Sequence, residues 1–192
     1  TPEAYAAAYA EGGWHVDAAA LSTLAACGSP EQHGAVLGAV RALYLPWLEA
    51  TARHLQQLIH AQGQSVSRRA PPIAAAAGRL VLFADGLRMD VAQQLAGKLA
   101  AAGIASTQDW EWSAIPSVTA TAKPAASPIA DAVQGGEASD GFATRLVSTG
   151  QPLTQERFVT ALQGRGWQVL GPDETGDPTG AAWTEAGALD KR

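Results

Sequence analysis

The sequence predicts an α/β protein that begins with a helical region. Residues 79–84 form a short, continuous apolar run followed by Asp-Gly, which is typical of a buried strand. After that run, segments with helical spacing of apolar residues alternate with strand-like segments. Residues 1–62, in contrast, show helical spacing and no strand-like pattern. The polar stretch 62–72 ends in Pro-Pro and reads as a linker. We therefore expect a helical region over residues 1–70 and an α/β region over residues 71–192.

Three helices are expected in the first region. The first contains Tyr5 and Tyr9 and should end at the Gly12-Gly13 pair, and the second, over residues 16–25, should stop at residues 28–30 (Gly-Ser-Pro). The third covers residues 36–59 and is long and amphipathic, with Pro46 as a kink or a boundary.

The α/β region should contain three strands separated by helices. Thr154 is suited to cap the second of these helices, and an acidic, irregular loop follows the last strand. Strands that alternate with helices indicate a parallel or mixed sheet with helices on both faces. The expected strands cover residues 79–84, 108–115 and 167–170, the helices 90–102 and 153–164, and the loop 172–180.

Composition excludes several classes of protein. The single cysteine, Cys27, rules out a disulfide framework and a thiolate zinc site. The 13 Lys and Arg residues against 18 Asp and Glu residues give no support for electrostatic binding of nucleic acid. No apolar run reaches the roughly 18–20 residues that span a bilayer, and the first residues do not resemble a signal peptide. We expect a cytoplasmic protein that does not enter a membrane.

Asp85 is the first residue that could carry chemistry. It follows the predicted strand 79–84, and ligands of α/β sheets bind beyond the carboxyl ends of the strands. A carboxylate there is a good ligand for a divalent metal, but Asp85 could equally cap the next helix. For Asp90 the capping role is favoured.

A second group lies in residues 116–124, past the expected strand 108–115 and hence on the same rim. Ser117, Thr119 and Thr121 offer hydroxyls and Lys123 a cation, which suits the binding of a phosphoryl group and attack on it. No histidine lies nearby, so metal coordination is the more plausible activator of a hydroxyl. The alternative is a Ser/Thr-rich turn with a helix cap. Pro124 disfavours helical geometry at Lys123.

A third group, residues 183–190, contains Glu185 and Asp190, which are either ligands or part of a solvated face. Together the three motifs (Asp-Gly-Leu-Arg-x-Asp, Pro-Ser-Val-Thr-Ala-Thr-Ala-Lys-Pro and Trp-Thr-Glu-x-Gly-x-x-Asp) resemble the PglZ domain of bacterial phage-defence (BREX/Pgl) systems. This domain is a branch of the alkaline phosphatase superfamily, and the resemblance covers residues 78–192. It implies the first part of an alkaline-phosphatase-like three-layer α/β/α sandwich.

The resemblance also implies a metal-dependent phosphodiesterase or phosphatase. Asp85, Thr119 and Asp190 would bind divalent metal, zinc or else manganese, and Thr119 would be the nucleophile, with Thr121 as the alternative. Lys123 would stabilise phosphoryl oxygens. The superfamily's His partner of Asp190 and its later Asp-His pair and final His have no counterpart before Arg192, so we expect a fragment of a longer protein with little activity by itself.

The implied partners are other phage-defence proteins and a phosphodiester substrate such as DNA or a nucleotide. Two alternatives remain open. One is a non-catalytic scaffold of a defence complex that docks its partners through residues 1–62. The other is a regulatory binder of nucleotides or nucleic acid, which the acidic composition disfavours.

Overall fold

The computed structural model describes residues 1–62, 71–112, 114, 116–136 and 141–186. The chain divides into two compact units. The helical unit comprises Thr1–Val66 and Leu87–Trp110, and the sheet unit comprises Ser67–Gly86 and Glu111–Arg192. The protein is therefore a mixed α/β protein, largely helical, with a small parallel sheet. The segment Leu87–Trp110 groups with the helices, whereas the sequence analysis placed it with residues 71–192.

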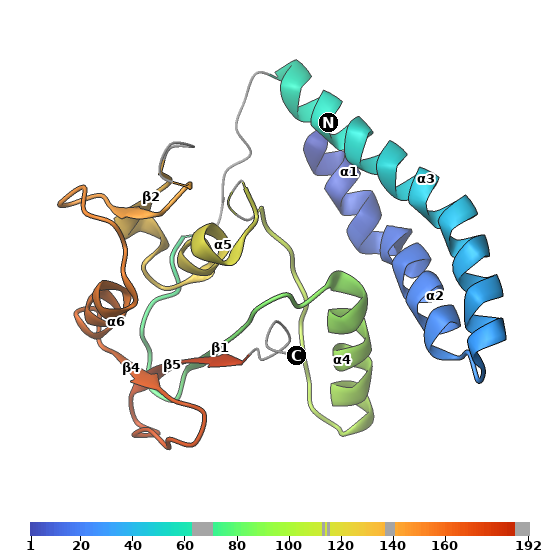
Figure 1. Cartoon of the computed structure of the whole chain (residues 1–192). Helices are drawn as coiled ribbons and strands as arrows, with labels where there is room; N and C mark the ends of the chain where they lie inside the picture. The colour runs from blue at the N-terminus through green and yellow to red at the C-terminus, as the bar shows by residue number, and fades with distance from the viewer. Residues whose placement is uncertain (63–70, 113, 115, 137–140, 187–192) are drawn as a thin grey trace. The chain divides into compact units, whose positions relative to one another are not determined.

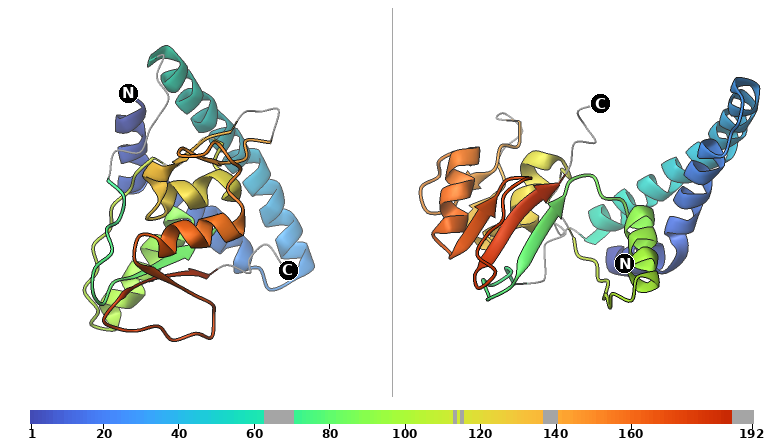
Figure 2. Two further views of the ribbon diagram at one scale, coloured as in Figure 1. Left: turned by 90° about the vertical axis from the view of Figure 1, so that its left-hand side faces the viewer. Right: turned by 90° about the horizontal axis from the view of Figure 1, so that it is seen from below.

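The helical unit contains two lines of helix that run alongside each other (Figures 1 and 2). The first line passes without a break through the Gly12-Gly13 pair, where we expected it to end, because the chain there forms a π-helical turn. The second line starts at Pro30, a residue suited to the first helical position, and runs through Pro46 as one helix. The elements are α1 (Pro2–Ala8), η1 (Tyr9–Gly13), α2 (Trp14–Ala25), α3 (Pro30–Gln62) and α4 (Met89–Ala101).

A buried polar cluster joins α4 to the other helices of this unit. Asp17 is 5% exposed, and its carboxylate accepts hydrogen bonds from the hydroxyls of Tyr9 and, at 2.5 Å, Tyr44. The guanidinium of Arg88 pairs with Asp90 at 2.9 Å and lies 4.0 Å from Asp17. Asp90 is 1% exposed and lies inside α4, where Arg88 is the N-cap, so the expected capping role of Asp90 is wrong. Its buried carboxylate instead pairs with Arg88, whose side chain is 46% exposed.

Three parallel strands form the sheet of the second unit, in the order β1-β5-β4. The predicted strands at 79–84 and 167–170 are confirmed as β1 (Leu80–Ala84) and β4 (Trp167–Leu170). The central strand β5 (Ala181–Ala186) was not predicted, since alanines give a weak apolar signal. The other elements are α5 (Thr119–Ala126), η2 (Ala130–Ala132), β2 (Val133–Gln134), β3 (Arg145–Leu146) and α6 (Gln155–Gln163), with β2 and β3 in an antiparallel pair.

The predicted strand at residues 108–115 is wrong for the part that the structure describes. Residues 108–112 and 114 have no regular secondary structure, and residues 113 and 115 lie outside the described residues. The side chain of Asp109 accepts a hydrogen bond of 2.8 Å from the backbone N–H of Trp110. This local bond occupies a donor that a strand ladder would need, which is how aspartate commonly competes with regular structure.

The core of the sheet unit lies on one face of the sheet. Trp183, in β5, is fully buried between Phe83 and Phe158, whose ring centroids lie 5.8 Å and 5.7 Å from its own. Both α5 and α6 lie on the same side of the sheet (Figure 1), so the described residues of this unit do not show the expected arrangement with helices on both faces. Leu80 and Leu82, which point to the other face of β1, are 59% and 57% exposed.

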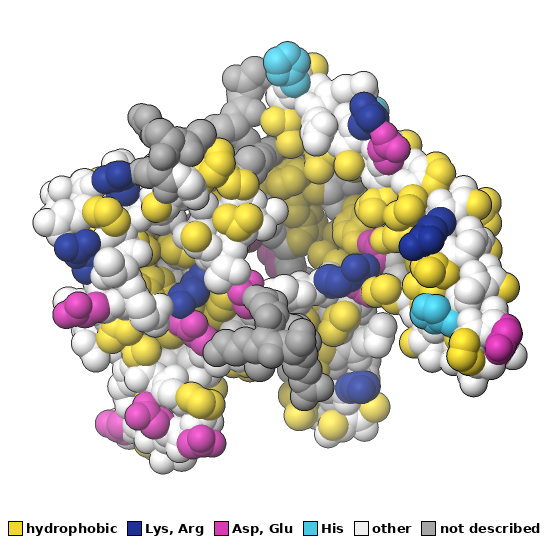
Figure 3. Space-filling view, in the orientation of Figure 1, with side chains coloured by type: hydrophobic (Ala, Val, Ile, Leu, Met, Phe, Trp, Pro, Cys, Tyr) yellow, Lys and Arg dark blue, Asp and Glu magenta, His cyan; other side chains and the backbone are white. Residues whose placement is uncertain are grey.

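Exposed apolar side chains also occur along the helical unit (Figure 3), for example Leu43, Leu45 and Leu48 of α3. Among the described residues, none of the helices combines the length and the apolar character needed to cross a bilayer.

Candidate functional site

The carboxyl ends of two neighbouring strands meet at the edge of the sheet where Asp85 lies. Strands β1 and β5 run parallel in a register that pairs Ala84 with Ala186. The backbone N–H of Asp85 extends this pairing by donating to the carbonyl of Ala186 at 3.2 Å. Gly86 follows with a φ of +69°, a left-handed conformation that glycine adopts without strain, and so the chain turns away directly after Asp85.

Helix α5 brings Thr119 to the same edge. Thr119 is the first residue of this helix, and its hydroxyl donates a hydrogen bond of 2.7 Å to Oδ2 of Asp85, 34 residues earlier in the chain. The structure thus joins two of the residues that the sequence analysis selected. Thr119 is an exposed residue.

The hydroxyl of Thr121, the alternative nucleophile, is used in contacts that stabilise the start of α5. Its side chain is buried, and its hydroxyl contacts the carbonyls of Pro116 and, at 2.9 Å, Val118. It also accepts a hydrogen bond of 3.3 Å from the N–H of Val118, which completes a capping interaction at the start of α5. These contacts account for the hydroxyl of Thr121, whereas the hydroxyl of Thr119 bonds to Asp85.

Lys123 lies within α5, although Pro124 disfavours helical geometry at the residue before it. A proline lacks the N–H that would bond to the carbonyl four residues earlier, which here belongs to Ala120. The hydroxyl of Thr144 donates to that carbonyl at 2.7 Å and replaces the missing bond. The helix therefore continues through Pro124.

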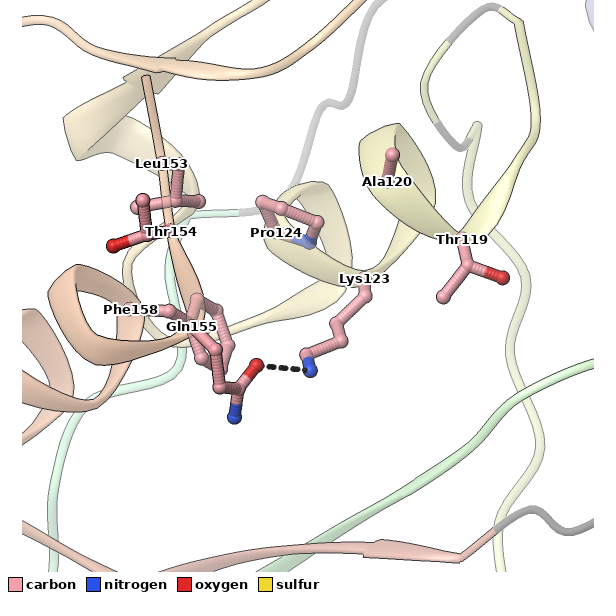
Figure 4. A pocket seen from close by; sticks show the side chains of 8 residues that line it. All are labelled: Thr119, Ala120, Lys123, Pro124, Leu153, Thr154, Gln155 and Phe158. Atoms are coloured by element: carbon pink, nitrogen blue, oxygen red, sulfur yellow. Dashed lines mark hydrogen bonds between the residues drawn. The ribbon is translucent and has the colours of Figure 1, made fainter. Parts of the chain in front are cut away.

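The ammonium of Lys123 is held by groups from β5 and α6. Nζ lies 2.8 Å from Glu185 and 3.0 Å from Oε1 of Gln155, and it sits 4.9 Å from the ring centroid of Phe158 (Figure 4). The indole N–H of Trp183 donates to the same carboxylate at 3.2 Å. Glu185, which the sequence left open between a ligand and a solvated face, is thus an ion-pair partner. Gln155 was not selected from the sequence, since a glutamine at a helix start carries no distinctive signal.

A small pocket of about 140 Å³ opens beside Thr119 and Lys123. The first residues of both α5 and α6 contribute to its wall, and Leu153, Pro124 and Phe158 supply an apolar side (Figure 4). The amino-terminal end of a helix carries partial positive charge and free N–H groups, which favour a bound anion. The lining residues are Thr119, Ala120, Lys123, Pro124, Leu153, Thr154, Gln155 and Phe158.

Asp85 and Thr119 are two oxygen donors that could hold a divalent ion between them. Two oxygens bound to one divalent ion lie about 3 Å apart when each metal–oxygen bond is about 2.1 Å. The separation of 2.7 Å between Asp85 Oδ2 and Thr119 Oγ1 is close to that value, so this pair fits two neighbouring ligands. No group of three or more His, Cys, Asp or Glu residues suited to a metal occurs in the part of the chain that the structure describes. The third expected ligand, Asp190, lies outside the described residues.

All four histidines belong to α2 and α3 of the helical unit. Comparisons of the chain with models of protein families, with curated proteins and with solved structures gave no match.

Proposed function

We propose that this chain forms part of a metal-dependent phosphoric ester hydrolase of the PglZ kind, within the alkaline phosphatase superfamily. Thr119 is the nucleophile, and Asp85, Thr119 and Asp190 bind a divalent metal, zinc or else manganese. The observation that carries the proposal is the hydrogen bond of 2.7 Å between Thr119 Oγ1 and Asp85 Oδ2 at the carboxyl edge of the sheet.

The chemistry of this pair supports the proposal. A threonine hydroxyl is a weak nucleophile unless a neighbouring group activates it. Asp85 accepts the hydrogen bond of this hydroxyl and so fixes the direction of its oxygen, while the start of α5 favours the negative charge that forms on it. A bound divalent metal would lower the pKa of the hydroxyl and neutralise phosphoryl oxygens.

The pocket that Thr119 lines is suited to an anion, although the hydroxyl of Thr119 points away from Gln155 and Phe158 (Figure 4). Its wall includes the starts of α5 and α6, whose dipoles favour a phosphoryl group. The proposed substrate is a phosphodiester such as DNA or a nucleotide, and the proposed partners are other proteins of a phage-defence system. Lys123 lies one helical turn from Thr119, and its ammonium is paired with Glu185.

Two measurements test the proposal. The first is calorimetric titration of the 192-residue chain with zinc alone, and then with manganese alone, in the wild type and in Asp85→Ala. We expect wild-type binding that the substitution weakens at least tenfold. A chain that binds neither metal would favour the non-catalytic scaffold.

The second measurement is hydrolysis of bis-p-nitrophenyl phosphate by the longer protein that the resemblance implies, because the three proposed ligands are fewer than two metals need. Thr119→Ala should remove turnover, and Ser117→Ala, an exposed hydroxyl of the same segment, is the matched control. Turnover that persists in the double variant Asp85→Ala/Thr119→Ala would refute the assignment.

A further inference from the structure

We infer that Lys123 and Glu185 are positioning residues, whose ion pair fixes α5 against β5 and so holds the hydroxyl of Thr119 on Asp85. The consequence for catalysis rests on the proposed function, whereas the consequence for the geometry of Thr119 does not.

The inference begins with two contacts of α5. Thr119 and Lys123 are four residues apart and therefore lie on one face of the helix. Thr119 bonds to Asp85, directly after β1, and Lys123 bonds to Glu185, near the end of the neighbouring strand β5. Because β1 and β5 are adjacent and in parallel register, these contacts attach one helical turn to two neighbouring strand ends.

The attachment at Lys123 is the firmer of the two. Its side chain is 16% exposed, and Nζ is held at once by Glu185, by Gln155 and by the face of Phe158. Glu185 is held in turn by the indole N–H of Trp183, a side chain with no exposed surface. An ammonium group that moved to a phosphoryl oxygen would have to leave three partners, so holding the helix is the role that its contacts support.

The attachment at Thr119 depends on the orientation of the helix. The hydroxyl oxygen lies about 4–5 Å from the helix axis, so a rotation of α5 by about 20° would move it by roughly 1.5 Å. A displacement of that size breaks a hydrogen bond of 2.7 Å. In an active site, an error of about 1 Å can lower the rate by about 100-fold. Loss of the Lys123–Glu185 pair should therefore displace the hydroxyl of Thr119 from Asp85, although neither Lys123 nor Glu185 contacts Thr119.

The first test follows Thr119 in the 192-residue chain by NMR of its labelled methyl group, assigned with Thr119→Ser. Lys123→Met keeps the apolar stem and removes the charge, and Glu185→Gln keeps the shape. Both should change the methyl shift of Thr119 and average its side-chain rotamer, and the swapped pair Lys123→Glu/Glu185→Lys should restore part of the signal. Glu156→Gln, an exposed carboxylate in the first turn of α6, is the control.

A Thr119 methyl signal that is unchanged in both single variants would overturn the inference. Should Lys123→Met fail to fold, the isosteric Glu185→Gln decides the outcome alone.

The second test is titration with zinc alone. If the two residues acted only through their charges, Lys123→Met would strengthen zinc binding at Asp85 and Glu185→Gln would weaken it. A positioning role predicts that both weaken it by about tenfold and that the double variant is no weaker than either. Opposite signs would overturn the inference. A wild-type chain that binds no zinc would refute the proposed function, and the NMR result would still decide the positioning role.

Discussion

The strongest prediction separates the two threonines of α5 by replacing each with valine. Thr121 is 5% exposed, and Thr121→Val removes a hydroxyl that contacts the carbonyls of Pro116 and Val118 and the N–H of Val118. Loss of a helix cap costs about 1 kcal/mol, and a buried partner left without a hydrogen bond costs about 1–3 kcal/mol. We expect Thr121→Val to lower the free energy of unfolding of the sheet unit by about 2 kcal/mol.

The matched substitution Thr119→Val removes one hydrogen bond at an exposed position. Asp85 remains accessible to water, so the free energy of unfolding should change by less than about 1 kcal/mol. Zinc binding should weaken strongly, since one proposed ligand and its contact with Asp85 are lost. Thr121→Val should retain zinc binding below the temperature at which it unfolds.

Hydrogen exchange measured by mass spectrometry on the peptide that covers residues 116–126 gives the local stability of α5. Urea unfolding followed by tryptophan fluorescence gives the stability of the whole chain. The reasoning is refuted if Thr121→Val exchanges as slowly as the wild type, or if it loses zinc binding while Thr119→Val keeps it.

Three further predictions concern the rest of the chain. Burial, and then Asp17, raises the pKa of Tyr9 well above its usual value near 10, so the folded state favours the neutral hydroxyl. This stabilisation is complete below pH 10 and is lost as the pH rises toward the folded-state pKa of Tyr9. The urea concentration at the midpoint of unfolding, measured from pH 8 to 11, should therefore fall more steeply for the wild type than for Tyr9→Phe. Gly86→Ala should lower the free energy of unfolding by about 1 kcal/mol because Gly86 has a positive φ, and Gly86→Asn should lower it less. Thermal unfolding measures both losses, and a smaller loss for Gly86→Ala than for Gly86→Asn would contradict the strain at this turn. Phe158→Ala should cost about 3–5 kcal/mol in urea unfolding, against less than about 1 kcal/mol for the exposed Leu80→Ala; equal losses would contradict the core described for the sheet unit.

Local signals in the sequence were sufficient for elements whose side chains repeat with a clear period. The apolar run at residues 79–84, the helix capped by Thr154 and the strand at residues 167–170 occur where they were predicted. The hydroxyl of Thr154 accepts a hydrogen bond of 3.3 Å from the N–H of Arg157, as expected of an N-cap. In each case the deciding interactions lie within a few residues of the element.

The remaining elements depend on partners far away in the sequence. Strand β5 has a weak apolar signal of its own and is defined by pairing with β1 and β4 on either side. Lys123 is helical because the hydroxyl of Thr144 supplies the bond that Pro124 cannot make. Residues 108–112 alternate like a strand, but no described strand pairs with them.

The candidate site shows the same division. The position of Asp85 after a strand could be predicted from its neighbours along the chain, although one face of that strand is exposed and not buried as predicted. Its contact with Thr119 joins residues that are 34 positions apart, and the pairing of Lys123 with Glu185 spans 62 positions. The sequence suggested that a hydroxyl and a cation lie near Asp85, but only the structure identifies Glu185 as the partner of that cation, Lys123.

The way the chain passes between the two units has a consequence for dissecting the protein. The backbone leaves the helical unit after Val66, returns to it at Leu87 and leaves it again after Trp110. Each unit is therefore assembled from separate stretches of sequence, and no single cut yields either one intact. A chain shortened to start at residue 71 would retain α4 but lose Asp17, and the buried carboxylate of Asp90 would face solvent together with the surface that packs on α2. Separating the units requires two simultaneous changes: removal of residues 1–66 and replacement of Leu87–Trp110 by a short linker that reconnects Gly86 to Glu111.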